Sequence, residues 1–236
     1  MEENNIYNMA NALINEYTNF IESIKCIPTE DCITLRHIID LKSVLANVNN
    51  VITLLATHAV AYKIAEAFEF SEAETRRLIG KINEVGPNTN GYDIHMDDPK
   101  ILVEVKCNKL IDGKFGAAQL KSMQNDILKL LKPSPEKHKK TYETIKSTKE
   151  YLKILTLVNF DDISAQKLVE PLTKEVKCKE GTSEDRKKRK GTWKHVKLLE
   201  GSLPSCVPSD EKEDKVYILV LAMQDLEYSL NKILAK

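Results

Sequence analysis

One short stretch of the chain combines apolar and charged residues in a way that strongly limits the fold. Residues 91–96 and 100–106 are typical of the two strands of a β-hairpin, with a turn at residues 96–99. The second strand is rich in Ile, Leu and Val, which predicts that it is buried in a sheet. It nevertheless contains Glu104 and Lys106. Because burying such charges costs free energy unless they are paired or bind a metal, the fold has to supply partners for them.

The alternation of side chains along a strand brings these charges together. Residues i and i+2 point to the same face, so Glu104 and Lys106 project side by side. Asp93, on the neighbouring strand, can reach the same spot. Carboxylate oxygens are good ligands for a hard divalent cation, and an ammonium group stabilises charge that develops on a phosphate. The three residues therefore predict a site for a divalent cation and a phosphodiester.

The charge of the chain is unevenly distributed, although its 35 basic and 35 acidic residues cancel. Residues 1–99 contain 7 Lys and Arg against 15 Asp and Glu, whereas residues 100–200 contain 24 against 14. A basic central region is compatible with a polyanionic partner. The alternative is a set of lysines that decorate solvated helices, and the charge distribution alone does not decide between the two.

Composition favours a cytoplasmic protein. The five cysteines are irregularly spaced and include no CxxC pair, which argues for free thiols and against a structural zinc site. The five histidines have no HxH or HExxH spacing. The N-terminus lacks the basic start and apolar core of a signal peptide, and no apolar run is expected to span a membrane. We therefore expect a cytoplasmic location and no membrane partner.

Periodicity predicts a mixed α/β (α+β) fold. We expect a helical N-terminal section at residues 1–56, packed on the core, and a main domain at 57–236, with a weakly marked boundary near 50–56. Ser71 followed by Glu74 predicts a helix start of the capping-box type. Helices are expected at 117–131, 164–173 and 225–235, and strands at 151–160 and 216–222. The order implies a mixed central sheet flanked by helices, and residues 177–195 are interpreted as a long loop.

The spacing of the charged residues in the hairpin resembles a known signature. Asp93 and Glu104 lie eleven positions apart, and Lys106 follows two further on. This D…ExK pattern resembles the signature of the PD-(D/E)xK nuclease superfamily, which includes many type II restriction endonucleases. Tyr92 stands where the full signature has proline, a residue that is often missing in the superfamily. The resemblance covers about residues 57–160 and implies a restriction-endonuclease-like catalytic domain within 57–236.

The resemblance implies roles for the residues of the motif. Asp93, Glu104 and the carbonyl of Val105 would bind Mg²⁺, with Mn²⁺ able to substitute. Lys106 would orient or activate the attacking water and stabilise the developing charge. By the same analogy an acid on the preceding helix joins the site. Glu66 and Glu84 are the two candidates, and the sequence does not choose between them.

Further residues are candidates for contacts outside the metal site. Gln119 begins the helix after the ExK strand and resembles an accessory catalytic position of the superfamily, with a solvated glutamine as the alternative. Basic residues near that helix and in the 177–195 segment could contact DNA phosphates. These candidates are Lys109, Lys114, Arg186, Lys187, Lys188, Arg189, Lys190 and Lys194. The alternative for the second group is a flexible solvated loop.

The function that the resemblance implies is Mg²⁺-dependent hydrolysis of DNA. A type II restriction enzyme that cuts duplex DNA as a homodimer is the leading expectation. A repair, recombination or mobile-element nuclease that acts on branched or single-stranded DNA is one alternative. A non-catalytic nucleic-acid-binding module, in which the hairpin carboxylates are structural, is another. The sequence does not give the recognition site, the cut pattern or the oligomeric state.

Overall fold

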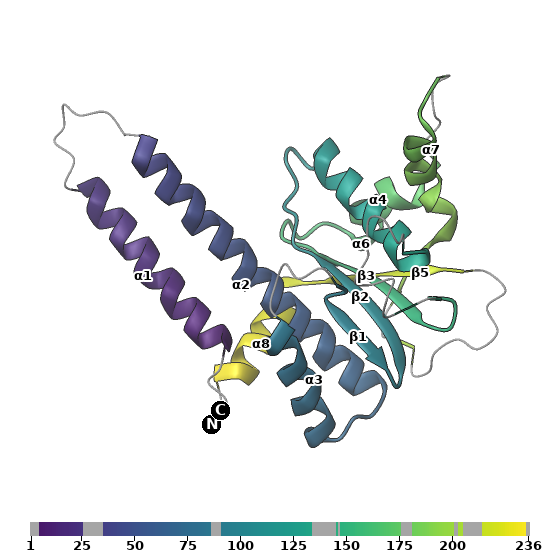
Figure 1. Ribbon diagram of the computed structural model, residues 1–236, viewed down its shortest axis with the longest axis horizontal. Helices are drawn as coiled ribbons and strands as arrows, with labels where there is room; N and C mark the ends of the chain where they lie inside the picture. The colour runs from purple at the N-terminus through teal and green to yellow at the C-terminus, as the bar shows by residue number, and fades with distance from the viewer. Residues whose placement is uncertain are drawn as a thin grey trace.

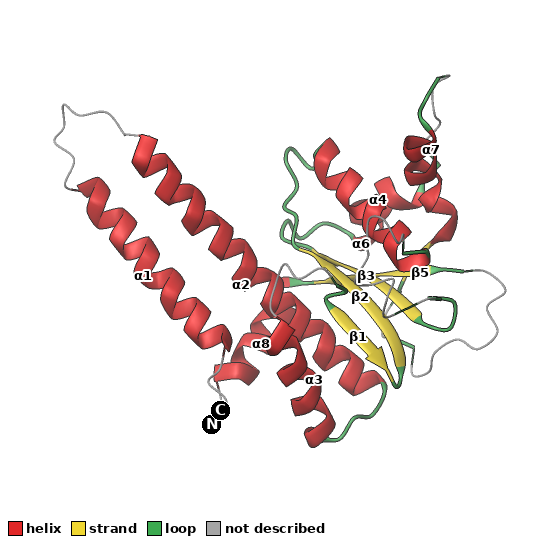
Figure 2. Cartoon of the chain, viewed as in Figure 1, coloured by secondary structure: helices red, strands yellow, loops and turns green. Residues whose placement is uncertain are grey.

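The computed structural model describes residues 5–25, 35–85, 91–133, 145, 147–175, 181–200, 203–204 and 214–234. Within this part of the chain the fold is mixed α/β, with one five-stranded sheet and helices on both of its faces (Figures 1 and 2). The predicted mixed sheet flanked by helices is thereby confirmed.

The sheet has the strand order β1-β2-β3-β5-β4. β1 and β2 form the predicted antiparallel hairpin, and every other neighbouring pair is parallel. β2 thus lies inside the sheet, between β1 and β3, as its apolar composition requires. The strands are β1 (Ile94–Asp97), β2 (Lys100–Lys106), β3 (Leu152–Val158), β4 (Val196–Leu198) and β5 (Val216–Leu221).

Two apolar cores lie on opposite faces of the sheet. The first is covered by α2 (Leu35–Ala67), α3 (Glu72–Val85) and α8 (Met223–Leu234). The second is covered by α4 (Ala117–Leu131) and α6 (Ala165–Thr173). Figure 2 shows the sheet enclosed between these two helical layers.

The alternation of side chains along β2 decides where its charges point. Ile101, Val103 and Val105 belong to the core under α2, whereas Leu102 belongs to the core under α4. Glu104 and Lys106 share the side of Leu102, because side chains two residues apart point the same way. Both charged groups therefore project side by side, as the i and i+2 spacing predicts, and the face they share is the one that α4 covers.

Local helix signals are also confirmed. The backbone N–H of Ser71 donates to the Glu74 carboxylate at 2.8 Å, and the backbone N–H of Glu74 donates to Ser71 Oγ at 3.3 Å. This reciprocal pair is the predicted capping box at the start of α3. Ser164 caps α6 with a single bond, by accepting from the backbone N–H of Lys167 at 3.3 Å.

The N-terminal helices form an arm that leaves the body of the protein. α1 (Asn5–Lys25) lies beside the first half of α2, and the pair projects beyond the sheet (Figure 1). The second half of α2 packs on the sheet, and the helix continues without a break through residues 56 and 57. Large apolar side chains stay exposed on the arm, among them Ile14, Tyr17, Leu35, Ile38 and Leu45.

α2 is unusually long and apolar. By length and composition it is the one helix among the described residues that could cross a membrane, and 44% of its most apolar window is buried inside the protein. A core helix of this length gives the same result. The finding nevertheless qualifies the sequence expectation that the chain contains no apolar run of spanning length.

The interpretation of residues 177–195 as a long loop is wrong for the part that the structure describes. Residues 184–190 form α7 (Glu184–Lys190), and the next five form a 3-10 helix, η1 (Gly191–His195), that leads into β4. The acidic residues Glu184 and Asp185 lie in the first turn of α7 and the basic run lies in its last turn. This order complements the helix dipole, and it favours a helix where polarity alone suggested a loop.

Candidate functional site

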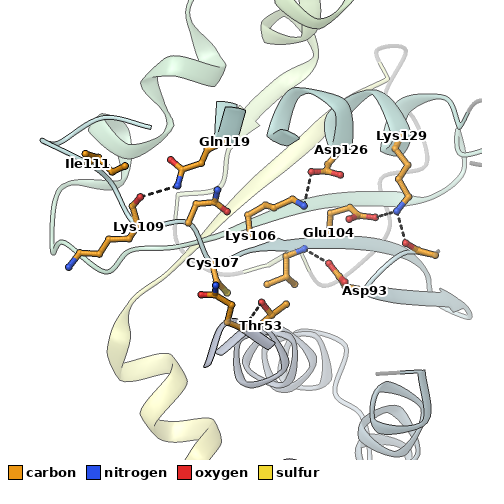
Figure 3. A pocket seen from close by; sticks show the side chains of 14 residues that line it. Thr53, Asp93, Glu104, Lys106, Cys107, Lys109, Ile111, Gln119, Asp126 and Lys129 are labelled. Carbon is orange, nitrogen blue, oxygen red and sulfur yellow. Dashed lines mark hydrogen bonds and ion pairs between the residues drawn. The ribbon is translucent and has the colours of Figure 1, made fainter. Parts of the chain in front are cut away.

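A pocket of about 710 Å³ opens at the carboxyl-terminal end of β2. Its wall combines residues from α2, from the segment before β1, from β2 and the loop after it, and from α4. Asp93, Glu104, Val105 and Lys106 all line it (Figure 3). The sequence prediction that these residues converge is therefore what the structure shows.

Glu104 is the most deeply buried acid of this pocket, with 6% of its side chain exposed. Its Oε1 atom accepts a hydrogen bond from Nζ of Lys129, on α4, at 2.5 Å. Burial and the nearby charge of Asp93 raise the pKa of Glu104 to about 8, despite the Lys129 ion pair. The folded protein therefore holds this carboxylate with too little countercharge, because desolvation outweighs the single salt bridge.

Asp93 is held by the backbone of the next strand. Its Oδ2 atom accepts a hydrogen bond from the backbone N–H of Val105 at 2.6 Å. Burial raises the pKa of Asp93, although the hydrogen bond from Val105 and the charge of Lys106 oppose the rise. Because the N–H and C=O of one strand residue point to the same edge, the carbonyl of Val105 also faces the side of β2 where Asp93 lies.

Lys106 forms an ion pair with α4, the helix that covers its face of the sheet. Its Nζ lies 2.9 Å from Oδ2 of Asp126, on α4, and both side chains are largely buried. Burial lowers the pKa of Lys106, but the charges of Asp126, Glu104 and Asp93 raise it overall. Lys106 is therefore a cation in the folded protein at neutral pH.

Cys107 follows directly after the ExK strand, and its thiol hydrogen bonds with Thr53 of α2. Burial raises the pKa of the Cys107 thiol to about 12. A thiol that is protonated at neutral pH is a poor nucleophile, so this cysteine is not suited to covalent catalysis. The other four cysteines lie outside the described residues.

The donor set fits a magnesium ion. Among the described residues, no three His, Cys, Asp or Glu side chains are arranged to hold one ion. Mg²⁺ does not require such a cage, because it keeps several waters and binds through one or two carboxylates. Asp93 and Glu104 offer a half-buried and a buried carboxylate whose pKa values are raised, and Val105 offers a carbonyl on the same side. A divalent cation between them would relieve their repulsion.

Sequence reasoning missed the residues that α2 and α4 contribute. Asp126 and Lys129 lie one turn apart on α4, beside the buried stripe of Met123, Ile127 and Leu130. Both residues border the apolar face of a helix that follows a strand with buried charges. This position is the sequence signal that could have identified Asp126 and Lys129 as partners of those charges. Asn49 and Thr53 line the pocket from α2, so this wall carries an amide and a hydroxyl.

Neither of the two glutamates proposed as a further metal ligand lies at the pocket. Glu66, near the end of α2, and Glu84, near the end of α3, are exposed and line no part of it. The expectation that one of them completes the site is not supported. The pocket meets α2 at Thr53, and 13 residues at about 1.5 Å each place Glu66 roughly 20 Å further along the axis.

Gln119 and Lys109 lie at the rim of the pocket. The Gln119 side chain accepts from the backbone N–H of Gly116 at 2.8 Å and donates to the carbonyl of Lys109 at 3.3 Å. Its amide therefore closes the first turn of α4 and ties the preceding loop to it. Lys114 lies in the same loop and is exposed, outside the pocket wall.

The basic run lies away from the pocket. α7 packs beside α4 and carries Arg186, Lys187, Lys188, Arg189 and Lys190, and Lys194 follows in η1 (Figure 1). None of these six residues lines the pocket. Arg186, Lys187, Lys188 and Lys194 are exposed, so their ammonium and guanidinium groups are accessible to an anionic partner.

Comparison with known proteins adds no assignment. No protein-family model, no curated protein and no solved structure matches this chain.

Proposed function

We propose that the protein is a Mg²⁺-dependent endodeoxyribonuclease of the PD-(D/E)xK type, acting on duplex DNA as a type II restriction enzyme does. The observation that carries the proposal is the convergence of Asp93, Glu104 and Lys106 in one pocket at the end of β2. The order of hairpin, helix α4 and parallel strand β3 is also the order of helix and strands that the superfamily core has.

In the proposed reaction each residue has a separate task. Asp93, Glu104 and the Val105 carbonyl would hold the metal ion, which would supply Lewis-acid stabilisation of the charge on the phosphate. Lys106, kept cationic by Asp126, donates to the attacking water or to the phosphate oxygens. Lys109 and Lys114 contact the DNA backbone near the pocket, and the basic residues of α7 and η1 contact it further away.

One observation favours a second candidate. Glu104 is already paired with Lys129, and Lys106 is paired with Asp126. Two buried ion pairs of this kind would suffice for a structural charge network in a non-catalytic nucleic-acid-binding module. Such a module would bind no divalent ion in this pocket and would hydrolyse no DNA.

A cleavage assay separates the two candidates. Supercoiled plasmid and phage DNA are incubated with the purified chain and Mg²⁺, and wild type is compared with Glu104→Ala and Lys106→Ala. We expect wild type to cut, and each variant to lose at least about 100-fold in rate, as removal of a metal ligand or an electrostatic stabiliser does elsewhere.

The control for this assay is Glu66→Ala, which removes an exposed glutamate outside the pocket and should cut like wild type. Circular dichroism checks that all three variants fold. Cutting at the wild-type rate by folded Glu104→Ala or Lys106→Ala would refute the assignment of the site. Absence of cutting by wild type on duplex, single-stranded and branched DNA would favour the structural network.

A further inference from the structure

Lys129 is surrounded by groups that bind cations. Its Nζ donates to Oε1 of Glu104 and to the carbonyl of Gly91, at 2.5 Å in each case, and lies 4.9 Å from the centre of the Tyr92 ring. Only 12% of the side chain is exposed. A carboxylate, a backbone carbonyl and an aromatic face thus enclose one ammonium group from three sides.

The backbone of Lys129 is fixed to the same structure. The hydroxyl of Tyr92 donates to the carbonyl of Lys129 at 3.0 Å, so one tyrosine contacts both the main chain and the side chain of this residue. The position of the ammonium is therefore set by α4 and by the segment before β1 together. This is a preformed cation position beside Glu104, and it is separate from the pair that Lys106 forms with Asp126.

Two of these groups, the Glu104 carboxylate and the Gly91 carbonyl, are also ligands that a divalent metal ion prefers. We infer that Lys129 is a tethered cation, whose ammonium occupies a second cation position of the pocket and limits the site to one divalent ion. The inference rests on the proposed metal site at Asp93 and Glu104. A second ion cannot share Oε1 with the ammonium, because like charges a few ångströms apart in a buried site repel strongly.

Charge counting supports this inference. Besides the exposed Lys109, the pocket wall contains three acids, Asp93, Glu104 and Asp126, and two lysines, Lys106 and Lys129, that pair with Asp126 and Glu104. A carboxylate gives up its proton when it binds a metal ion, so in the metal-binding state these five groups sum to −3 + 2 = −1, and removal of Lys129 makes the sum −2. The variant pocket would thus attract a second divalent ion, with the Gly91 carbonyl and Glu104 Oε1 freed to bind it.

The test is the number of Mn²⁺ ions that bind, measured by isothermal titration calorimetry without DNA. Lys129→Met keeps the apolar stem and removes the charge, and Lys121→Met is the matched control, an exposed lysine on the same helix. We expect one ion per chain for wild type and Lys121→Met, and two for Lys129→Met. The first ion should bind to Lys129→Met at least tenfold more tightly than it binds to wild type. If Lys129→Met does not fold, Lys129→Gln, which keeps a hydrogen-bonding side chain, replaces it and should also bind two ions.

The outcomes separate this inference from the proposed function. If wild type and the folded Lys129 variant both bind one ion with equal affinity, the tethered-cation inference is wrong and the nuclease proposal stands. If wild type binds no ion but the variant binds one, the proposed metal site of the native pocket is overturned, and with it the inference that Lys129 limits that site to one ion. If neither protein binds Mn²⁺, both are overturned.

Discussion

At the scale of single residues, the pocket is a compromise between burial and charge. Glu104 and Lys106 interrupt a strand that is otherwise apolar, and each forms an ion pair with a residue of α4. Replacing such pairs by apolar residues is often neutral or stabilising, so stability alone is a weak reason for a protein to contain them. Their position at the wall of an open pocket is a better reason.

The raised pKa of Glu104 predicts how stability depends on pH. Between the ordinary pKa of a glutamate, 4.5, and about 8, the folded state retains a proton that the unfolded state has lost. The free energy of unfolding therefore falls as the pH rises through this window, with a slope of at most about 1.4 kcal/mol per pH unit. Glu104→Gln cannot ionise and should lose this part of the dependence.

Urea unfolding in EDTA at pH 5, 6, 7 and 8 measures this effect. EDTA removes divalent ions, so that only the protonation of the protein changes. Glu66→Gln serves as the control, since it alters an exposed glutamate on α2 away from the pocket, and it should keep the wild-type slope. Equal slopes for wild type and Glu104→Gln would contradict the assignment of the raised pKa to this residue.

At the scale of elements, local patterns were predicted correctly, whereas the residues that α2 and α4 bring to the pocket were not. The hairpin, α4 and the capping box at Ser71 follow from short-range periodicity and turn chemistry, which the sequence displays directly. The sequence named Glu66, which does not line the pocket, because nothing local shows which turn of a 33-residue helix meets the end of β2. For the same reason Asp126 and Lys129 were not identified, since their partners Lys106 and Glu104 lie 20 and 25 residues away, on another element.

Short elements were the other failure of the sequence interpretation. α7 has seven residues and β4 has three, and each is stabilised mainly by its neighbours, α4 and β5. Segments of this length contain too few residues to show a period. The polar composition of α7 therefore resembled that of a loop, and β4 was not predicted.

The capping box of α3 gives a prediction at the element scale. Ser71→Ala removes the hydroxyl that accepts from the backbone N–H of Glu74, and it leaves that N–H without its cap. We expect a loss of about 1 kcal/mol in the free energy of unfolding, within a range of roughly 0.5–2 kcal/mol. Urea unfolding measures the loss, and Asn125→Ala, at an exposed site within α4, is the control.

Because α3 packs on the core under α2 and contributes nothing to the pocket wall, Ser71→Ala should also leave Mn²⁺ affinity unchanged. A change in unfolding free energy below 0.3 kcal/mol (about the size of a neutral surface substitution) would show that the cap contributes little.

At the scale of the whole molecule, the arm of α1 and α2 exposes several large apolar side chains close together. Ile38 and Leu45 are two helical turns apart on one side of α2, with 55% and 54% of each residue exposed, and Leu35 continues the stripe. Exposed apolar patches of this kind mark contact sites. A second copy of the chain, packing its own arm in the same way, would bury both stripes in a four-helix arrangement with twofold symmetry.

We therefore predict that the arm forms the homodimer that the resemblance to restriction enzymes implies. Light scattering coupled to size exclusion should give twice the chain mass of 26.8 kDa for wild type. The double variant Ile38→Asp/Leu45→Asp should give the mass of one chain, because two buried carboxylates per arm would face their copies across the interface.

Asn15→Asp/Asn125→Asp adds the same charge at exposed polar sites and should remain dimeric. A monomeric wild type, or a dimer that survives the Ile38 and Leu45 substitutions, would exclude the arm as the interface. Because the stripe lies on α2 and the pocket is at the end of β2, a monomeric double variant should still bind Mn²⁺ like wild type, which separates assembly from the chemistry of the site.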